Sequence, residues 1–303
     1  MGARAVVSVF SFPFMSATRL PYESVVGYQV GRWPFGMPSR AICYRIDHTL
    51  IDTGPPNQWR AVRRFVEEEH QAHGIERVVC THHHEDHSGN AARIQELLDV
   101  PVYAPVKSLE RLEEGFPIEI YRRIVWGTPP SVTAQPLPET LPLASGATLR
   151  AHPAPGHAED MVCLHVPERG WLFTADLFLS PRLEYLRYDE DVYALADSLH
   201  RMAQLDVGTL FCGHRGVVEH GAQALQTKAR YLEALCGQVN RRYYREQQPL
   251  LRIQRELLGR EGLLRWVTGG DFSKSNLIDS CIRHDDNASG GTYDMITTPT
   301  PMQ

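Results

Sequence analysis

The stretch from Thr81 to His87 constrains this chain more than any other, because it places four histidines and two acids within seven residues. It directly follows the apolar run Val78–Cys80, which predicts a short buried strand that ends in a loop. A loop at a strand end can direct several imidazole groups at one point, and neutral imidazole binds zinc and other borderline metals. A histidine-rich turn without function is the alternative, but the pattern favours a metal site.

The totals are those of an ordinary globular protein. A chain of 303 residues with 43% apolar content can hold one large domain, or one domain with a small appendage. Its net charge of −5 argues against a protein that binds polyanions over its whole surface. The six cysteines are widely spaced and fall in apolar runs, so we expect free thiols in a reducing compartment.

Nothing in the sequence predicts a targeting or membrane segment. The apolar residues 5–10 are followed closely by Ser11 and Pro13, which favours a first strand over a signal peptide. No run approaches the roughly 18 apolar residues of a membrane span. We therefore expect a cytoplasmic protein without a membrane partner.

Strand and helix patterns divide the chain near residue 222. Before that point strands alternate with helices, and a β-α-β unit around helix 57–73 places the histidine stretch at a carboxyl end, the usual ligand side. After it only helices are predicted. We expect a catalytic domain over 1–222, a helical C-terminal domain over 223–284 and a frayed tail over 285–303. The predicted strands are 4–12, 25–30, 41–46, 48–51, 78–80, 101–104, 148–152, 162–166, 171–175 and 207–212, and the predicted helices are 57–73, 88–98, a broken 107–126, 192–205, 222–246, 249–259 and 274–284.

Three later segments carry further metal-competent side chains. Pro155-Gly156-His157 precedes a predicted strand, while Phe173–Asp176 and Phe211–His214 end strands. With these, the chain resembles the metallo-β-lactamase superfamily, whose H-x-H-x-D-H signature is met by residues 82–87, and the upstream element Ile51–Gly54 also matches. The resemblance covers about the first 220 residues and implies an αββα sandwich of two β-sheets with helices outside.

The resemblance also implies a dinuclear metal site. Carried over residue by residue, it gives one ion the ligands His82, His84 and His157, gives the other Asp86, His87 and His214, and makes Asp176 the bridge. With an acid at the bridging position, the site resembles that of glyoxalase II and related hydrolases. Zinc is the expected metal, with iron or manganese as alternatives. Asp86 is also the expected catalytic group, which orients the attacking water or takes its proton.

Other residues have more open readings. Asp52 is expected to hold a ligating histidine or its loop by hydrogen bonds, although a turn acid at a strand end is the alternative. His83 should point away from the metals. Arg215 follows the last ligand, where it could bind a substrate carboxylate or face solvent, and the sequence leaves both open.

The substrate must be recognised by segments outside the metal motif. The segments 107–130 and Leu177–Tyr188 are expected to line the site, with Tyr121, Tyr185 and Tyr188 as candidate contacts. The alternative is that these aromatic residues belong to the hydrophobic core. The segment from Lys228 to Arg265 is basic, which suits either a solvated helix face or a patch for an anionic substrate. Its nine cations, against Glu233, Glu246, Glu256 and Glu261, are Lys228, Arg230, Arg241, Arg242, Arg245, Arg252, Arg255, Arg260 and Arg265.

These observations predict a hydrolase of a small anionic thioester or ester, similar to hydroxyacylglutathione hydrolases. An endoribonuclease or phosphodiesterase, a lactonase and a mononuclear iron persulfide dioxygenase are alternatives within the superfamily. A binding or regulatory module without enzymatic activity is the alternative from another class. Nucleic acid is not the expected partner, because no large nuclease insertion is visible, and the number of subunits is not predicted.

Overall fold

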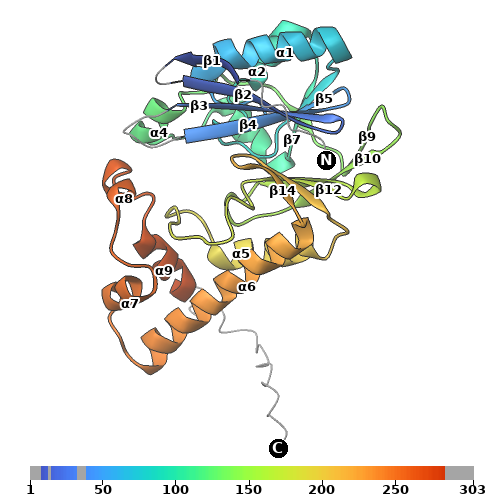
Figure 1. Ribbon diagram of the computed structural model, residues 1–303. Helices are drawn as coiled ribbons and strands as arrows, with labels where there is room; N and C mark the ends of the chain where they lie inside the picture. The colour runs from blue at the N-terminus through green and yellow to red at the C-terminus, as the bar shows by residue number, and fades with distance from the viewer. Residues whose placement is uncertain (1–7, 13–14, 33–38, 284–303) are drawn as a thin grey trace, which may run out of the picture.

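The computed structural model describes residues 8–12, 15–32 and 39–283, and it arranges them in four layers (Figure 1). Two β-sheets pack face to face, and helices cover the outer face of each sheet. The αββα architecture predicted from the sequence is therefore confirmed. The predicted tail over 285–303 and the start of the first predicted strand lie outside the described residues.

The first sheet follows the chain order without a crossover. Its first five strands are antiparallel, and the last four of the sheet, beginning with Thr49–Ile51, run parallel to one another. Within the described residues its strands are β1 (Ser8–Phe12), β2 (Met15–Tyr22), β3 (Val25–Arg32), β4 (Ser39–Ile46), β5 (Thr49–Ile51), β6 (Arg77–Val79), β7 (Val102–Ala104) and β8 (Gln135–Pro136).

The second sheet has the order β14-β13-β12-β11-β10-β9, and only its β12–β13 pair is parallel. A parallel pair needs a crossover, and here the crossover contains helix α5 (Val192–Ala203). The strands are β9 (Thr140–Pro142), β10 (Thr148–Pro153), β11 (Val162–Val166), β12 (Trp171–Ala175), β13 (Thr209–Cys212) and β14 (Gly216–Glu219).

Alternation along the strands builds three hydrophobic layers. In β12, Trp171 and Phe173 face the other sheet, whereas Leu172 faces the outer helices, as the two-residue period of a strand requires. In β4, Tyr44 faces the other sheet and Cys43 faces the opposite layer. Both faces of these central strands are therefore buried, which fixes their register.

The helices of the first half cover the first sheet. Helix α1 (Trp59–His73) ends at Gly74, whose φ of 69° favours glycine, and α2 (Ala91–Leu98) packs beside it. Two short helices, α3 (Leu109–Glu114) and α4 (Ile120–Val125), replace the broken helix predicted over 107–126.

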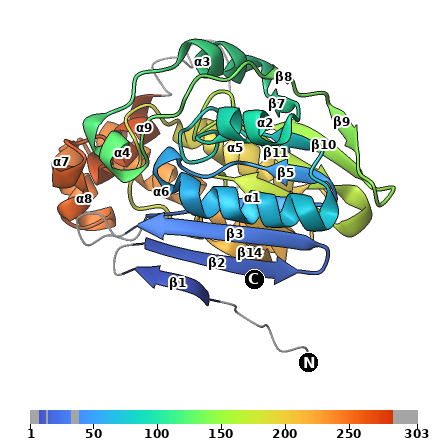
Figure 2. The same ribbon diagram turned by 90° about the horizontal axis from the view of Figure 1, so that it is seen from above.

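The C-terminal helices lie at one end of the sandwich, beside α4 (Figure 2). Helix α6 (Gly221–Asn240) runs along α5, and Leu225 and Leu232 share one hydrophobic cluster with Leu199 of that helix. The boundary predicted near residue 222 thus divides helices that share a core. The remaining helices are α7 (Leu250–Leu257), α8 (Leu263–Val267) and α9 (Lys274–Arg283). None of the described helices is long and apolar enough to cross a membrane.

The structure adds elements that the sequence patterns did not predict. Strands β2, β8, β9 and β14 and helix α8 were not expected. Strands β8, β9 and β14 lie at sheet edges and are two to four residues long, so pairing with one neighbour defines them rather than an apolar pattern. Helix α8 has only five residues, too few for a helical period to be recognised.

Candidate metal centre

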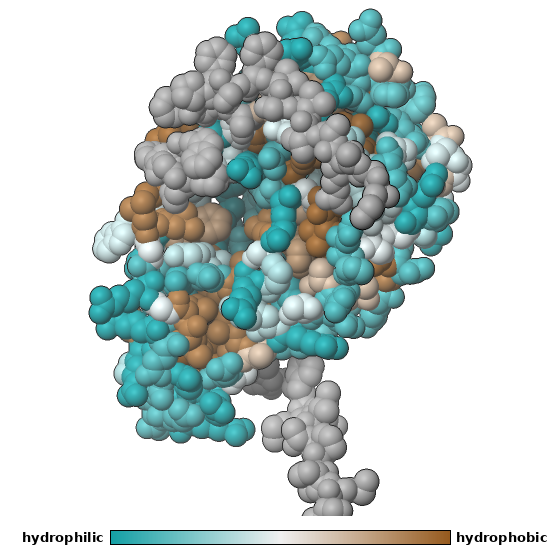
Figure 3. All heavy atoms as spheres, in the orientation of Figure 1, coloured by the Kyte–Doolittle hydropathy of each residue, from teal (hydrophilic) through white to brown (hydrophobic). Residues whose placement is uncertain are grey.

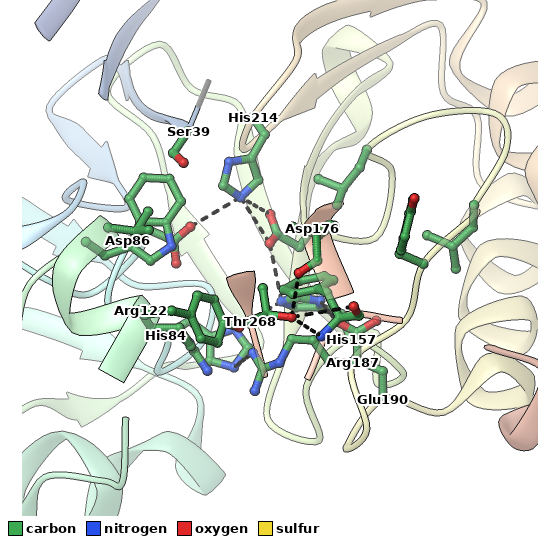
Figure 4. A pocket seen from close by; sticks show the side chains of 18 of the residues that line it. Ser39, His84, Asp86, Arg122, His157, Asp176, Arg187, Glu190, His214 and Thr268 are labelled. Atoms are coloured by element: carbon green, nitrogen blue, oxygen red, sulfur yellow. Dashed lines mark hydrogen bonds and ion pairs between the residues drawn. The ribbon is translucent and has the colours of Figure 1, made fainter. Parts of the chain in front are cut away.

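The metal-competent side chains meet where parallel strands of both sheets end. The loop that contains His82, His84, Asp86 and His87 follows β6, while Asp176 and His214 follow the parallel strands β12 and β13. Because the carboxyl ends of parallel strands lie at the same edge of a sheet, the loops that follow them converge there. His157 reaches the same point from the turn after β10. Figure 4 shows Asp86, His157, Asp176 and His214 directed at one region.

One group consists of three histidines. His84 Nδ1 lies 3.0 Å from His82 Nε2 and 3.0 Å from His157 Nε2, and all three side chains are buried. These ring nitrogens fall within one ligand-sized cluster. Three imidazoles whose ring nitrogens converge in this way form a set that zinc or a similar ion can use.

A second group lies beside the first. Asp86, His87 and His214 supply ligand atoms that also cluster, with His214 Nε2 3.4 Å from Asp86 Oδ2. Asp176 lies between the groups: its Oδ1 is 3.0 Å from His214 Nε2, and its Oδ2 is 3.3 Å from His157 Nε2. The structure thus brings together all seven side chains that the sequence singled out, with one carboxylate in contact with both groups.

The donor set fits metal ions. Among the described residues, His87 Nε2 and Asp176 Oδ1 are buried and make no well-formed hydrogen bond, although they lie 3.2 Å apart. A shared ion would satisfy both atoms, which are otherwise costly to bury. Glycine at position 213 keeps this space open, because a Cβ there would lie 2.8 Å from His87 Cε1 and 3.1 Å from Asp176 Oδ1.

Electrostatics differ between the groups. Burial lowers the pKa of His82 and of His84 well below the usual value, and neighbouring histidines lower it further. Burial acts the same way on His214, but Asp176 outweighs it and raises the pKa of His214 to about 9. Burial opposes protonation of His87 as well, yet Asp176 and Asp52 hold its pKa well above normal. His82 and His84 are therefore neutral and ready to ligate, whereas His87 and His214 hold protons that a metal would displace.

Asp52 directly follows β5, and its side chain contacts the loop after β6 at two points. Its Oδ1 accepts a 2.8 Å hydrogen bond from the Thr81 backbone N–H, and its Oδ2 lies 2.8 Å from His87 Nδ1. A carboxylate on the far nitrogen of a histidine fixes the ring so that the other nitrogen faces inward. Asp52 occupies the left-handed region at φ 58°, a conformation that aspartate tolerates better than most residues.

Two further carboxylates each orient a histidine of this region, and sequence reasoning missed both. Glu190 Oε1 lies 2.8 Å from His157 Nδ1, and Asp160 accepts hydrogen bonds from the backbone and side chain of His83. Burial alone would raise the pKa of Asp160, but the hydrogen bonds from His83 and Ser108 lower it. His83 therefore points at Asp160 rather than at the ligand cluster. No motif in the sequence marked these acids.

A buried ion pair fixes helix α4 to the ligand loop. Arg122 Nε lies 2.7 Å from Glu85 Oε1 and Arg122 Nη2 lies 2.5 Å from Glu85 Oε2, a bidentate geometry. Burial raises the pKa of Glu85, and the guanidinium opposes that shift. Because Glu85 is fully buried, its charge depends on this one partner.

The ligands open into a cavity of about 580 Å³. This volume is typical of a small-molecule site. It lies between the metal-binding loops, α4, the loop 179–190 and the C-terminal segment around α8. The lining residues are Ser39, Arg40, His84, Asp86, Tyr121, Arg122, Val125, Trp126, His157, Asp176, Leu179, Leu183, Tyr185, Arg187, Glu190, Leu195, His214, Lys228, Leu264, Val267, Thr268 and Phe272.

The predicted substrate contacts divide into two sets. Tyr121 and Tyr185 line the cavity. Tyr188 and Arg215 are exposed and do not line it, because Tyr188 turns outward at 56% exposure and Arg215 points to solvent in the turn before β14. Of the two positions that the sequence left open for Arg215, the structure has the one that faces solvent, and it gives Tyr188 no contact with the cavity.

The basic C-terminal segment contributes one cation to the cavity, and sequence reasoning did not separate that residue from the rest. Lys228 of α6 is 1% exposed, and its Nζ donates to Leu177 O at 2.8 Å. Burial lowers the pKa of Lys228 to about 8. Arg241, Arg242 and Arg245 do not line the cavity, and the first two pair with Glu246 and Glu256.

Comparison with known proteins agrees with this geometry. Residues 43–214 match the family model described as the metallo-beta-lactamase superfamily, which is more than half of the chain. The chain belongs to the metallo-beta-lactamase superfamily. The matched range contains all seven metal-competent residues.

Two of the curated relatives are longer than this chain. The atrochrysone carboxyl ACP thioesterase of Aspergillus fumigatus is 26% identical over 77% of this chain and 64% of its own length. Thioesterase pkgB of Emericella nidulans is 30% identical over 64% of this chain and 49% of its own length. The chain thus spans about half to two thirds of these relatives. A metallo-beta-lactamase family protein of Thermus thermophilus has the same fold, with a TM-score of 0.59, 19% identity and coverage of 91% of this chain and 95% of that one.

Proposed function

We propose that this protein is a hydrolase that cleaves thioesters with the help of two divalent metal ions, of which zinc suits the donors best. The observation that carries the proposal is the convergence of seven histidine and aspartate side chains at the base of one cavity. Two relatives are named as thioesterases, which supports a thioester over other hydrolysable bonds.

Each ligand has a role in this proposal. His82, His84 and His157 would hold one ion, Asp86, His87 and His214 would hold the other, and both would share Asp176. When bound, such a pair of ions polarises a carbonyl oxygen and makes water a nucleophile at neutral pH. Asp52 and Glu190 hold His87 and His157 in the orientation that ligation requires.

Asp86 is the proposed proton acceptor. It lines the cavity, and its Oδ2 is 3.4 Å from His214 Nε2, so it lies on the substrate side of the centre. Asp86 takes a proton from the attacking water while the new C–O bond forms. The C–S bond then breaks, Asp86 returns the proton to the leaving thiolate, and the new carboxylic acid loses its own proton to solvent, so the products are a carboxylate and a thiol. No serine or cysteine nucleophile is required. Each cysteine of the described chain is buried, and burial raises the pKa of Cys43, Cys80 and Cys212.

Metal analysis together with a substrate panel tests the proposal. Protein purified without chelator should contain nearly two equivalents of metal, and it should hydrolyse acyl-thioesters, glutathione thioesters among them, faster than lactones, β-lactams or RNA. Chelation should abolish the activity and added zinc should restore it. Full activity with one stable equivalent would exclude the two-metal mechanism, and cleavage of RNA without turnover of any thioester would overturn the substrate class.

A further inference from the structure

Around α8, the side of the cavity that faces the metal ligands is mainly apolar. Leu264 and Val267 of α8 and Phe272 in the following turn line it, and Leu179 and Leu183 continue the surface from the loop after β12. Hydrophobic residues also gather over the C-terminal helices on the face shown in Figure 3. Branched and aromatic side chains in a cavity of this size favour an apolar occupant.

On this side, the hydroxyl groups of Thr268 and Tyr121 already have partners. The hydroxyl of Thr268 donates to Leu264 O at 2.9 Å and accepts from the Phe272 backbone N–H at 3.1 Å. The hydroxyl of Tyr121 donates to Asp271. A polar or charged substrate group placed here would lose its water without gaining hydrogen bonds, which is unfavourable.

The apolar side is also preformed. Leu186 and Ser273 exchange two backbone hydrogen bonds of 3.1 Å, which attach the C-terminal segment to the loop before α5. Glu261 accepts hydrogen bonds from the backbone N–H groups of Lys274 and Ser275. The segment between α7 and α9, which contains α8, is therefore fixed at both ends. A surface that is ordered before binding loses little entropy when a ligand arrives.

We infer that the C-terminal helices form an acyl pocket, and that the natural substrate is a thioester whose acyl group is an apolar chain or ring packed against Leu264, Val267 and Phe272. This inference rests on the proposed thioesterase function. The reacting carbonyl carbon of a thioester bears two groups, the acyl chain and the thiol carrier. The acyl chain is the one that fits the apolar side of the cavity. Carrier thiols are rich in amide and charged groups, which the apolar side cannot satisfy.

A chain-length series tests the acyl pocket. Thioesters of one small thiol, with acyl groups from acetyl to decanoyl, should show kcat/KM rising about threefold to fourfold per methylene until the pocket is full. Leu264→Trp fills the pocket, so the ratio of kcat/KM for octanoyl over acetyl should fall at least tenfold. Val267→Phe should act in the same direction.

Leu263→Trp is the matched control. Leu263 precedes Leu264 on the same helix, but it is 62% exposed and does not line the cavity. Its substitution should leave the octanoyl-to-acetyl ratio unchanged. A flat length series in the wild type, or equal ratios for Leu263→Trp and Leu264→Trp in folded proteins, would overturn the acyl pocket. If Leu264→Trp fails to fold, Val267→Phe decides.

A binding measurement separates this inference from the proposed function. Calorimetry of octanoyl thioester with the zinc-supplemented Asp176→Asn variant detects binding when hydrolysis is blocked. Binding that is lost on adding Leu264→Trp supports the pocket even if the wild type hydrolyses no thioester. Hydrolysis by the wild type without length dependence, together with equal binding of acetyl and octanoyl thioesters, would leave the hydrolase intact and remove the pocket.

Discussion

The two sides of the cavity are built on different principles. On the metal side several of the proposed ligands are positioned by a second polar group, as His87 is by Asp52 and His157 is by Glu190. On the side of the C-terminal helices, apolar residues such as Leu264 and Phe272 are positioned by backbone hydrogen bonds and packing. Chemistry needs atoms held at fixed distances, whereas selection of an apolar group needs only shape and exclusion of water.

The comparison predicts that substitutions on the metal side are costly and specific. Asp176→Ala should lower kcat at least about a hundredfold, because it removes the carboxylate common to both ligand groups and several kcal/mol of stabilisation with it. Steady-state kinetics and metal content measure this. Asp197→Ala is the control, since Asp197 is an exposed acid of α5 paired with Arg201. Two bound metals and near-normal turnover in Asp176→Ala would show that the shared-ligand assignment is wrong.

The Glu85–Arg122 pair tests whether the polar side is also needed for stability. Arg122→Met should lower the free energy of unfolding by roughly 3–5 kcal/mol, because Glu85 would be left buried without a partner. Chemical denaturation of metal-free protein measures the change. The double variant Glu85→Leu/Arg122→Met should recover most of it, and Arg123→Met, an exposed neighbour, should cost less than about 1 kcal/mol. Equal losses for Arg122→Met and Arg123→Met would contradict the argument.

The same contrast explains what the sequence could predict. Metal ligation restricts residue type and spacing, so His82, His84, Asp176 and the other ligands stood out without a structure. The αββα fold followed from the resemblance that those residues carry. The acyl side uses Leu264 and Val267, which cannot be told from core residues until the C-terminal helices are placed.

Glu190 and Lys228 were unpredictable for a related reason. An acid in the segment after Tyr188 reads as a solvated charge until the loop before α5 brings it within 2.8 Å of His157. A lysine on α6 reads as part of a basic helix face until that helix packs on α5 and buries it. Local patterns report residue type and period, whereas these roles come from tertiary packing.

Lys228 is the one charged residue among those that the described C-terminal helices add to the cavity, and its protonation should affect the free energy of unfolding. Its pKa is about 8 in the folded chain and about 10.4 when unfolded. Between these values the unfolded chain binds more protons, so the stability of the metal-free wild type should rise with pH relative to Lys228→Met, by roughly 3 kcal/mol at most.

Denaturation of both proteins from pH 7 to 11 measures the difference and cancels other titrating groups. Lys107→Met is the matched control, because the side chain of Lys107 is 64% exposed. Its stability difference from the wild type should not change with pH in this window. A pH-independent difference for Lys228→Met as well would mean that Lys228 is not desolvated in solution.

The contribution of Asp52 to the metal side can be tested through zinc affinity. Asp52→Asn keeps the shape but removes the charge that orients His87, so zinc affinity should fall about tenfold to a hundredfold. Competition with a chromophoric chelator measures it. Asp99→Asn should have no effect, because Asp99 is an exposed C-cap residue in the left-handed region, where asparagine is well tolerated. Unchanged zinc affinity in Asp52→Asn would remove Asp52 from the metal-binding machinery.

The smallest effect is expected from the basic face of the C-terminal helices. Replacing Arg241, Arg242 and Arg245 with glutamine should leave KM and kcat within about twofold, because none of them lines the cavity and exposed ion pairs contribute only about 0–1 kcal/mol. Kinetics at low and high salt are the measurement. A substrate held by these arginines would instead show a raised KM that approaches the wild-type value as salt screens the charges. That result would assign the anionic handle of the substrate to the outer face of these helices, and it would limit their apolar side to packing.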